Sequence, residues 1–360
     1  MTTSTFDAVL VLSFGGPEQP EDVLPFLRNV TRGRNVPDER LAEVAEQYAV
    51  FGGRSPINDQ CRNLIDALTV ELAANGHDLP IYWGNRNWHP MLADTVATMA
   101  EDGVSNALVF TTSAFGSYSG CRQYRQDLAG AIEAVGPTAP RLQKLRLFYN
   151  HPGFIEPLAA NLAEAIGEPP AAGDPSHRVV FTAHSIPNSM AAACSYEAQL
   201  HEAARLTMAA AGLADHGFDL VYQSRSGPPH IPWLTPDVND HLVAINADGV
   251  KTVTVVPIGF VSDHMEVMFD LDTQAAETAA ELGMEMTRVP TVGIAPRFIT
   301  MIRELIDEQV AATPKLHLGS DGPWPDNCPA ADHCIPAGGP GRPGAGGGGR
   351  PGGGRPGGGA

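Results

Sequence analysis

Residues 252–258 read TVTVVPI, and residues 259–272, which follow directly, read GFVSDHMEVMFDLD. The first stretch is a short apolar run, rich in β-branched residues and ended by proline and glycine, which is typical of a buried strand in a parallel sheet. Ligands of α/β proteins bind beyond the carboxyl ends of such strands. This junction is therefore a candidate site, and its ionisable side chains are Asp263, His264, Glu266, Asp270 and Asp272.

A helix that begins at about Ser262 would place Asp263, Glu266 and Asp270 on one face, at positions i, i+3 and i+7. Carboxylates on one face repel one another unless a cation or a proton donor lies between them. The alternative is a solvated first helical turn, where the helix dipole favours acidic side chains. The residue pattern leaves both interpretations open.

The same kind of apolar run recurs along the chain and alternates with segments of helical spacing, which predicts an α/β fold with parallel sheets and helical crossovers. The alternation runs twice, before about residue 165 and after the Pro/Gly/Ala-rich stretch 167–176. We therefore predict one lobe over residues 1–166 and a second over 167–315. The other predicted strands are 7–14, 81–85, 106–114, 177–184 and 218–224, and the clearest helices are 89–103 and 195–212.

Composition narrows the function classes. The chain has 360 residues, 43% of them hydrophobic, and a formal net charge of −18, which argues against nucleic acid or an anionic membrane surface as partners. No apolar run approaches the ~20 residues of a membrane span, and the N-terminus does not resemble a signal peptide. Five cysteines in a chain of this length indicate a reducing cytoplasm. Residues 316–335 form a cysteine-containing extension, and the Gly/Pro/Arg-rich residues 336–360 are expected to be disordered.

Two further groups of residues suggest a site between the lobes. His184 ends the run VVFTAHSIP, where an imidazole could act as a base or a metal ligand, although a core histidine bonded to the backbone is the alternative. In the first lobe, aromatic side chains stand beside several arginines, a combination that suits a large flat ligand with carboxylates. Ordinary surface arginines are the alternative there. These residues are Phe14, Tyr118 and Tyr124 with Arg32, Arg34, Arg54, Arg122 and Arg125.

The ordered motifs LSFGGPE, FGGRSPIN, TSAFGSYSGCRQY, FTAHSIP and PIGFVSDHMEV resemble those of the ferrochelatase family, from about residue 5 to residue 315. The resemblance implies a chelatase-type fold in which two Rossmann-like lobes face a porphyrin cleft, with a helix at about 295–311 packed back on the first lobe. The motifs are closest to the high-GC Gram-positive branch. For that branch the resemblance implies insertion of Fe²⁺ into coproporphyrin III, a lyase reaction of haem b biosynthesis.

The resemblance also implies site residues. His184 and Glu266 match the catalytic pair that acts on the pyrrole protons and the incoming Fe²⁺. Asp270, one helical turn after Glu266, is an outer contact for the metal. The family's next carboxylate is Gln274 here, which puts an outer metal site in doubt. The implied porphyrin contacts are Ser55, Tyr124, Phe14 and Arg54, of which Phe14 replaces the tyrosine that binds the product iron in some relatives.

Part of the family carries a [2Fe–2S] cluster, and Cys121, Cys328 and Cys334 match the places of its ligands: one internal cysteine and the rest near the C-terminus. Such a cluster takes four ligands, usually thiolates. We assign the fourth to His333, since histidine replaces cysteine in some two-iron clusters, and Cys61 and Cys194 are interpreted as ordinary cysteines. A zinc site and unligated thiols are the alternatives. The other candidates for the fourth ligand are Asp332 and Asp326.

Other functions stay open on the sequence alone. A protoporphyrin IX ferrochelatase, a cobalt chelatase of the same superfamily and a non-catalytic tetrapyrrole-binding protein would share much of this pattern. The expected partners are the porphyrin and Fe²⁺, together with transient contacts to the upstream and downstream enzymes of haem synthesis. Neither nucleic acid nor an integral membrane segment is expected.

Overall fold

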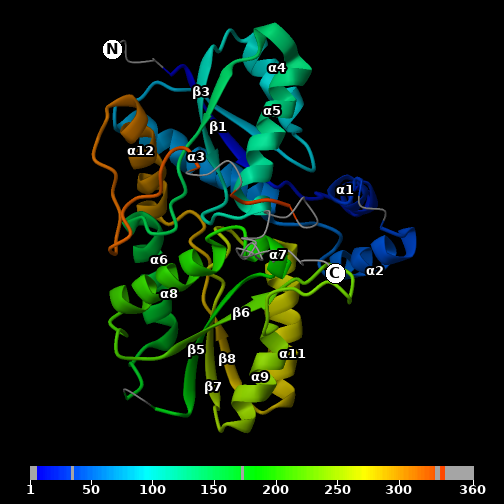
Figure 1. Ribbon diagram of the computed structural model, residues 1–360, viewed down its shortest axis with the longest axis vertical. Helices are drawn as coiled ribbons and strands as arrows, with labels where there is room; N and C mark the ends of the chain where they lie inside the picture. The colour runs from blue at the N-terminus through cyan, green and yellow to red at the C-terminus, as the bar shows by residue number, and fades with distance from the viewer. Residues whose placement is uncertain (1–5, 34–35, 172–173, 329–332, 337–360) are drawn as a thin grey trace, which may run out of the picture.

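Two parallel sheets, one above the other in Figure 1, form the framework of the computed structural model, which describes residues 6–33, 36–171, 174–328 and 333–336. The first four-stranded sheet has the order β2-β1-β3-β4, and the second has the order β6-β5-β7-β8. The strands are β1 (Ala8–Ser13), β2 (Ile81–Asn85), β3 (Asn106–Thr111), β4 (Arg141–Lys144), β5 (His177–His184), β6 (Phe218–Gln223), β7 (Thr252–Val256) and β8 (Glu285–Arg288). The predicted α/β fold is confirmed. The short edge strands β4 and β8 were not predicted, because RLQK and EMTR carry little apolar pattern.

Helices cover both faces of each sheet, which is why the strands are apolar throughout. Side chains of β1 alternate between the faces: Leu10 and Leu12 pack with α4 and α5, and Val9 and Val11 pack with α3 and α12. Within the described ranges, no helix has both the length and the apolarity to cross a membrane. The α-helices are α1 (Val23–Val30), α2 (Asp38–Val50), α3 (Ile57–Ala74), α4 (Leu92–Glu101), α5 (Gln123–Val135), α6 (Pro152–Ile166), α7 (Asn188–Ala191), α8 (Tyr196–Ala210), α9 (Val238–Ala247), α10 (Met265–Val267), α11 (Ala276–Glu281) and α12 (Pro296–Val310).

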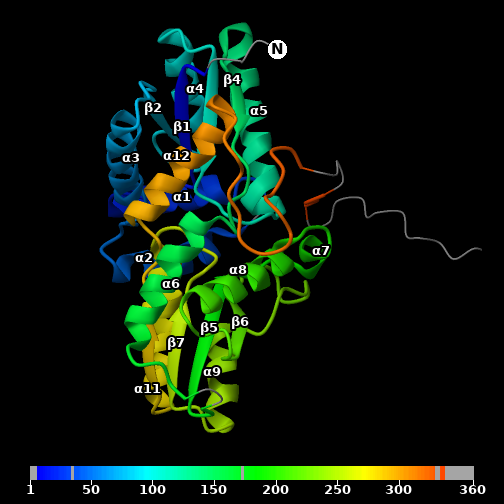
Figure 2. The ribbon, with the colours of Figure 1, turned by 90° about the vertical axis from the view of Figure 1, so that its left-hand side faces the viewer.

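The largest apolar core runs through both sheets. It includes Val9 and Val11 of the first sheet, Phe181 of the second, and buried side chains of α3, α6, α8 and α12. Helix α12 follows the second sheet in sequence yet lies beside α3 of the first lobe (Figures 1 and 2). Because one core serves both sheets, the division into lobes at residues 166 and 167 stays a prediction. The tail 337–360 lies outside the described residues.

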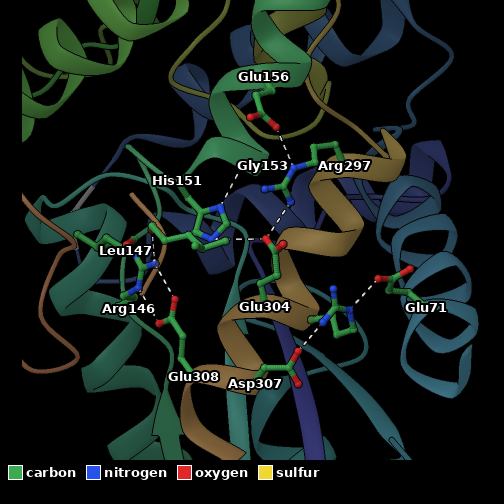
Figure 3. A network of polar contacts seen from close by, with 12 residues as sticks. Glu71, Arg146, Leu147, His151, Gly153, Glu156, Arg297, Glu304, Asp307 and Glu308 are labelled. Carbon is green, nitrogen blue, oxygen red and sulfur yellow. Dashed lines mark hydrogen bonds and ion pairs between the residues drawn. The ribbon is translucent and has the colours of Figure 1, made fainter. Parts of the chain in front are cut away.

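Ion pairs reinforce the docking of α12 (Figure 3). Arg146, which follows β4, makes two hydrogen bonds of 2.7 and 2.8 Å to the Glu308 carboxylate, and both side chains are almost fully buried. Arg297 pairs with Glu156 of α6 at 2.9 Å. Burial lowers the pKa of the nearby His151 to about 3, so this histidine is neutral and its contact with α12 is not an ion pair.

We expect Arg146→Met to lower the free energy of unfolding by about 3–5 kcal/mol, because the Glu308 carboxylate would be left buried without its partner. Urea unfolding followed by circular dichroism measures the loss. Arg40→Met is the matched control, since Arg40 pairs with Glu43 on the surface of α2 and exposed pairs contribute less than about 1 kcal/mol. Equal losses in the two variants would contradict the role given to the buried pair.

Candidate functional site

The carboxyl ends of β5 and β7 bring the loops of the second lobe together. These strands are neighbours in the sheet, and His184 is the last residue of β5. Directly after β7, Gly259 passes so close to β5 that a Cβ atom there would lie 2.8 Å from the Cα of Ala183. The loop that leads to Glu266 is therefore held against the end of the strand that carries His184.

The His184 ring is oriented by a single backbone contact. Its Nδ1 lies within hydrogen-bond distance of the Ser185 carbonyl, which can only accept, so Nδ1 carries the proton in the neutral ring. The Nε2 atom then keeps its lone pair and faces the Glu266 carboxylate at 3.9 Å. His184 is 33% exposed and Glu266 is 51% exposed. This arrangement leaves a nitrogen lone pair and a carboxylate open to an incoming ligand.

The helix that carries Glu266 begins later than expected. The prediction of a helix from about Ser262 was wrong, because α10 starts at Met265 and Asp263 lies outside it. Asp263 pairs with Arg288 at 3.2 Å and accepts a hydrogen bond from Thr291, so it does not share a face with Glu266 and Asp270. A π-helical segment, Met268–Ala275, then carries Asp270. Wider turns of this kind are common at functional sites.

Asp270 lies in a partly buried polar niche at the end of β6. Burial raises its pKa to about 6, the charge of Glu266 acts in the same direction, and hydrogen bonds from Ser224 and Gln223 oppose the shift. Ser224 reaches Asp270 from a left-handed backbone conformation with φ of 60°, which is unusual for a residue with a side chain. Asp270 can therefore exchange a proton near neutral pH, next to Glu266.

The opposite wall is aromatic and comes from the first lobe. Phe26 lies at the centre, with ring centroids 6.2 Å from those of Phe14, Tyr48 and Trp88. Met265, next to Glu266 in the second lobe, belongs to the same apolar cluster. The charge of Glu266 also contributes to raising the pKa of Tyr48, after burial, so the wall and the carboxylate are close neighbours.

Arg86 was not singled out in the sequence, and the structure places it at this wall. Its guanidinium lies 5.8 Å from the centroid of Phe14 and 4.5 Å from that of Tyr124, and it pairs with Asp127 at 2.5 Å. Phe14 itself is 37% exposed. The only sequence signal for Arg86 is its position directly after the short apolar run 81–85.

The remaining predicted porphyrin contacts differ in exposure. Ser55 is 3% exposed and Tyr124 is 5% exposed, and the Arg86 guanidinium lies over the Tyr124 ring. Arg54 is half exposed and pairs with Asp59. The structure therefore groups Phe14 and Tyr124 around Arg86, and it places Arg54 on the surface at the start of α3.

The cysteine-containing extension returns to the junction of the lobes (Figure 2). Cys334 is 3% exposed, and His333 Nδ1 lies 3.0 Å from its sulfur and 3.5 Å from that of Cys328. A hydrogen bond with Cys194, then burial, then charges on the cysteines nearby, including Cys121, raise the pKa of Cys334. Cys194 is a free, partly buried cysteine whose thiol donates to the Ala191 carbonyl at 3.5 Å, and its interpretation as an ordinary cysteine stays a prediction.

The alternative cluster ligands are Asp326 and Asp332. Asp326 pairs with Lys315 at 2.6 Å, and Asp332 lies outside the described residues. Among the side chains that the structure describes, no three from His, Cys, Asp and Glu are arranged to hold a metal ion. The His184–Glu266 pair by itself offers two donor groups.

The fold defines a class of protein. The solved structure of SirB from Bacillus subtilis with Fe³⁺ superimposes with a TM-score of 0.54 at 9% identity, covering 85% of this chain and 96% of that one, so the two share the fold. The ferrochelatase family model matches residues 6–310. The chain therefore belongs to the ferrochelatase family.

Relatives agree with this assignment. A protein of Frankia alni named coproporphyrin III ferrochelatase is 52% identical over 343 residues, which cover 92% of this chain and 87% of that protein. A protein of Rhodopirellula baltica named ferrochelatase is 52% identical over 335 residues, which cover 92% and 93% of the two chains.

We predict that Asp270→Asn will flatten the pH dependence of stability. A folded-state pKa of about 6 lies above the unfolded value, so the folded protein binds more protons and loses stability as the pH rises through this range. Between pH 5 and 7.5 the loss from this group is about 1.4 kcal/mol, and it should be absent in the variant. Urea unfolding at both pH values measures the difference, with Asp240→Asn on the exposed side of α9 as control. Identical pH dependence in the wild type and in Asp270→Asn would contradict the assignment.

Proposed function

We propose that this protein inserts Fe²⁺ into coproporphyrin III, with His184 and Glu266 as the catalytic pair. The observation that carries the proposal is the lone pair of His184 Nε2, which faces Glu266 across 3.9 Å beside an aromatic wall. The choice of porphyrin is supported by the names of several relatives that are about half identical to this chain. Protoporphyrin IX is the alternative substrate.

Metal insertion releases the two pyrrole N–H protons of the porphyrin as Fe²⁺ takes their place. A neutral imidazole with a free lone pair can accept these protons or bind the ion as it loses water. The proposed path for protons runs from His184 to Glu266 and on to Asp270. Because the pKa of Asp270 is near 6, this carboxyl can receive a proton and pass it to solvent close to neutral pH. In this proposal Asp270 also serves as an outer contact for the hydrated ion.

The macrocycle would lie against the first lobe. An exposed aromatic face at Phe14 suits a flat apolar ring, and the Arg86 guanidinium beside it suits a propionate. We assign Ser55 and Tyr124 to the same surface, where they would act mainly through their neighbours because both are buried. Arg54 would reach a propionate after leaving Asp59.

We also propose a [2Fe–2S] cluster on Cys121, Cys328 and Cys334 that takes no part in chelation. His333 is the proposed fourth ligand, and the support is that its Nδ1 lies 3.0 Å from the sulfur of Cys334 and 3.5 Å from that of Cys328. A zinc ion is the alternative occupant. We further propose a cytoplasmic location and transient contacts with neighbouring enzymes of haem synthesis, on the basis of composition and family.

The two porphyrins separate the possible functions. Coproporphyrin III carries two more propionates than protoporphyrin IX, and each charged hydrogen bond contributes about 1.5–3 kcal/mol, so we expect its kcat/KM to be at least ~10-fold higher. Anaerobic Fe²⁺ insertion followed by absorption measures both rates. A preference for protoporphyrin IX would overturn the substrate assignment. Faster insertion of Co²⁺ than Fe²⁺ would favour a cobalt chelatase, and binding without turnover would favour a carrier.

We expect His184→Ala to abolish insertion while porphyrin affinity stays within about 3-fold, because affinity comes from ring stacking and carboxylate contacts. Glu266→Gln should retain slow turnover with an altered pH profile, since an amide cannot accept the proton. Steady-state rates and fluorescence quenching on porphyrin binding separate the two effects. His201→Ala on the exposed side of α8 is the control. Normal turnover by His184→Ala would rule out its catalytic role.

A further inference from the structure

A pocket of about 480 Å³ lies at the outer edge of the first sheet, and its size is within the ~300–1,000 Å³ of small-molecule sites. Its floor is β4, the last strand of the sheet, and one wall is α5, which lies beside that strand (Figure 2). Asp326 and Asn327 of the cysteine-containing extension form the other wall. None of the described residues around this β4 pocket belongs to the candidate functional site.

Three cationic side chains line the β4 pocket. Arg141 and Lys144 are the first and last residues of β4, and Arg125 belongs to α5. Over the ranges that the structure describes, none of the three has a carboxylate within ion-pair distance. The chain as a whole has a formal net charge of −18, so three cations without acidic partners stand out against the rest of the protein.

Lys144 is the most buried of these cations. It is 7% exposed, and its ammonium donates to the Leu145 carbonyl at 3.2 Å. An ammonium has three hydrogens to donate, and the described part of the chain offers this one no second acceptor. Burial lowers the pKa of Lys144, because a charge away from water is costly unless an anion lies near it. An anion in the β4 pocket would supply both the acceptors and the opposite charge.

Arg125 joins α5 to the extension and also has an unused donor. Its Nη2 donates to the Asp326 carbonyl at 3.0 Å, whereas its Nε is buried and has no hydrogen-bond partner among the described residues. The Asp326 carboxylate does not balance the cations of the pocket, because it already pairs with Lys315 at 2.6 Å and accepts from Gln309 at 3.2 Å. The β4 pocket therefore has more donors and positive charge than its own walls satisfy.

The backbone of the edge strand adds further donors. The amides of Arg141 and Leu145 donate to carbonyls on the side of β3, those of Ser105 and Val109. Because successive residues of a parallel strand bond to opposite sides, the amides of Leu142 and Lys144 point to the outer edge, along which the pocket runs.

The rest of the lining suits the body of an organic molecule. Leu128, Ala129 and Ile132 follow Arg125 by three, four and seven residues, so they share its face of α5. Leu142 of β4 adds a fourth apolar side chain. A molecule in the pocket would contact these side chains along its body and the cations at its acidic groups.

We infer that the β4 pocket binds a small organic anion with at least two acidic groups, either carboxylates or phosphates. Arg141 and Lys144 begin ~10 Å apart on the strand, a span that a single acidic group does not bridge. One group would pair with Lys144 and Arg125, and the other with Arg141. The bound molecule would also connect β4 and α5 to the extension at Asp326.

The test measures binding of citrate, inorganic pyrophosphate and acetate to the full-length protein by calorimetry in metal-free buffer of low ionic strength. Citrate or pyrophosphate should bind at one molecule per chain, and acetate at least ~10-fold more weakly. Lys144→Met and Arg141→Gln should each weaken binding at least ~10-fold, because each removes a charged hydrogen bond. Lys251→Met, at an exposed lysine before β7, is the matched control and should bind as the wild type does. The tighter of the two probes identifies the acidic groups as carboxylates or phosphates.

Two further measurements check folding and location. Without an anion, Lys144→Met should resist urea at least as well as the wild type, because it removes a buried charge, and Arg141 is exposed. Hydrogen exchange of the wild type should slow in β4 and at Asp326 when the probe is added. Four results would overturn the inference: no saturable binding of either probe, equal affinity in Lys144→Met and the wild type, equal weakening in Lys251→Met, or protection only around Arg86, where a porphyrin propionate is proposed to bind.

Discussion

One continuous apolar core holds the two sheets in a fixed relation, and the site depends on that relation. The core passes from β1 and β3 through α6, α8 and α12 to β5, so neither sheet can turn without exposing buried side chains. The buried Arg146–Glu308 ion pair fixes the position of α12 within this core. Since a buried charge requires its partner, the helix has little freedom to dock elsewhere. The carboxyl ends of the strands therefore face each other in one arrangement.

The two walls of the candidate site therefore differ in their chemistry. The first lobe presents aromatic rings with Arg86 among them, and the second lobe presents His184, Glu266 and Asp270. A flat tetrapyrrole needs apolar contact over its ring and cations at its edge, while the ion and the released protons need donors and acceptors at its centre. In the proposed reaction, the two lobes would supply different parts of the chemistry. The Ser185 carbonyl accepts from His184 Nδ1 and so leaves the Nε2 lone pair free in the neutral ring.

The proposed cluster would further restrict how parts of the fold move relative to one another. Its candidate ligands are Cys121, which follows β3 of the first lobe, and residues of the extension, so iron binding would tie the extension to the first lobe. Ligand bonds that join distant parts of a chain stabilise the folded state, because the unfolded chain holds no preformed site. In this proposal, the extension would have a structural role that is separate from chelation.

The sequence by itself determined the class of fold and the starts of the central strands to within one residue, because buried parallel strands are apolar on both faces and so form continuous apolar runs in the sequence. It also singled out His184, Glu266 and Asp270, since polar residues directly after such strands stand out. Only the tertiary structure determined which side chains these residues contact. Asp263 pairs with Arg288 and so lies off the acidic face, and Arg86 lies between the rings of Phe14 and Tyr124. The Cys334 amide donates to the Ala193 carbonyl, although the two residues are far apart in the sequence. Contacts of this kind depend on how distant segments pack, and no local pattern of residues encodes them.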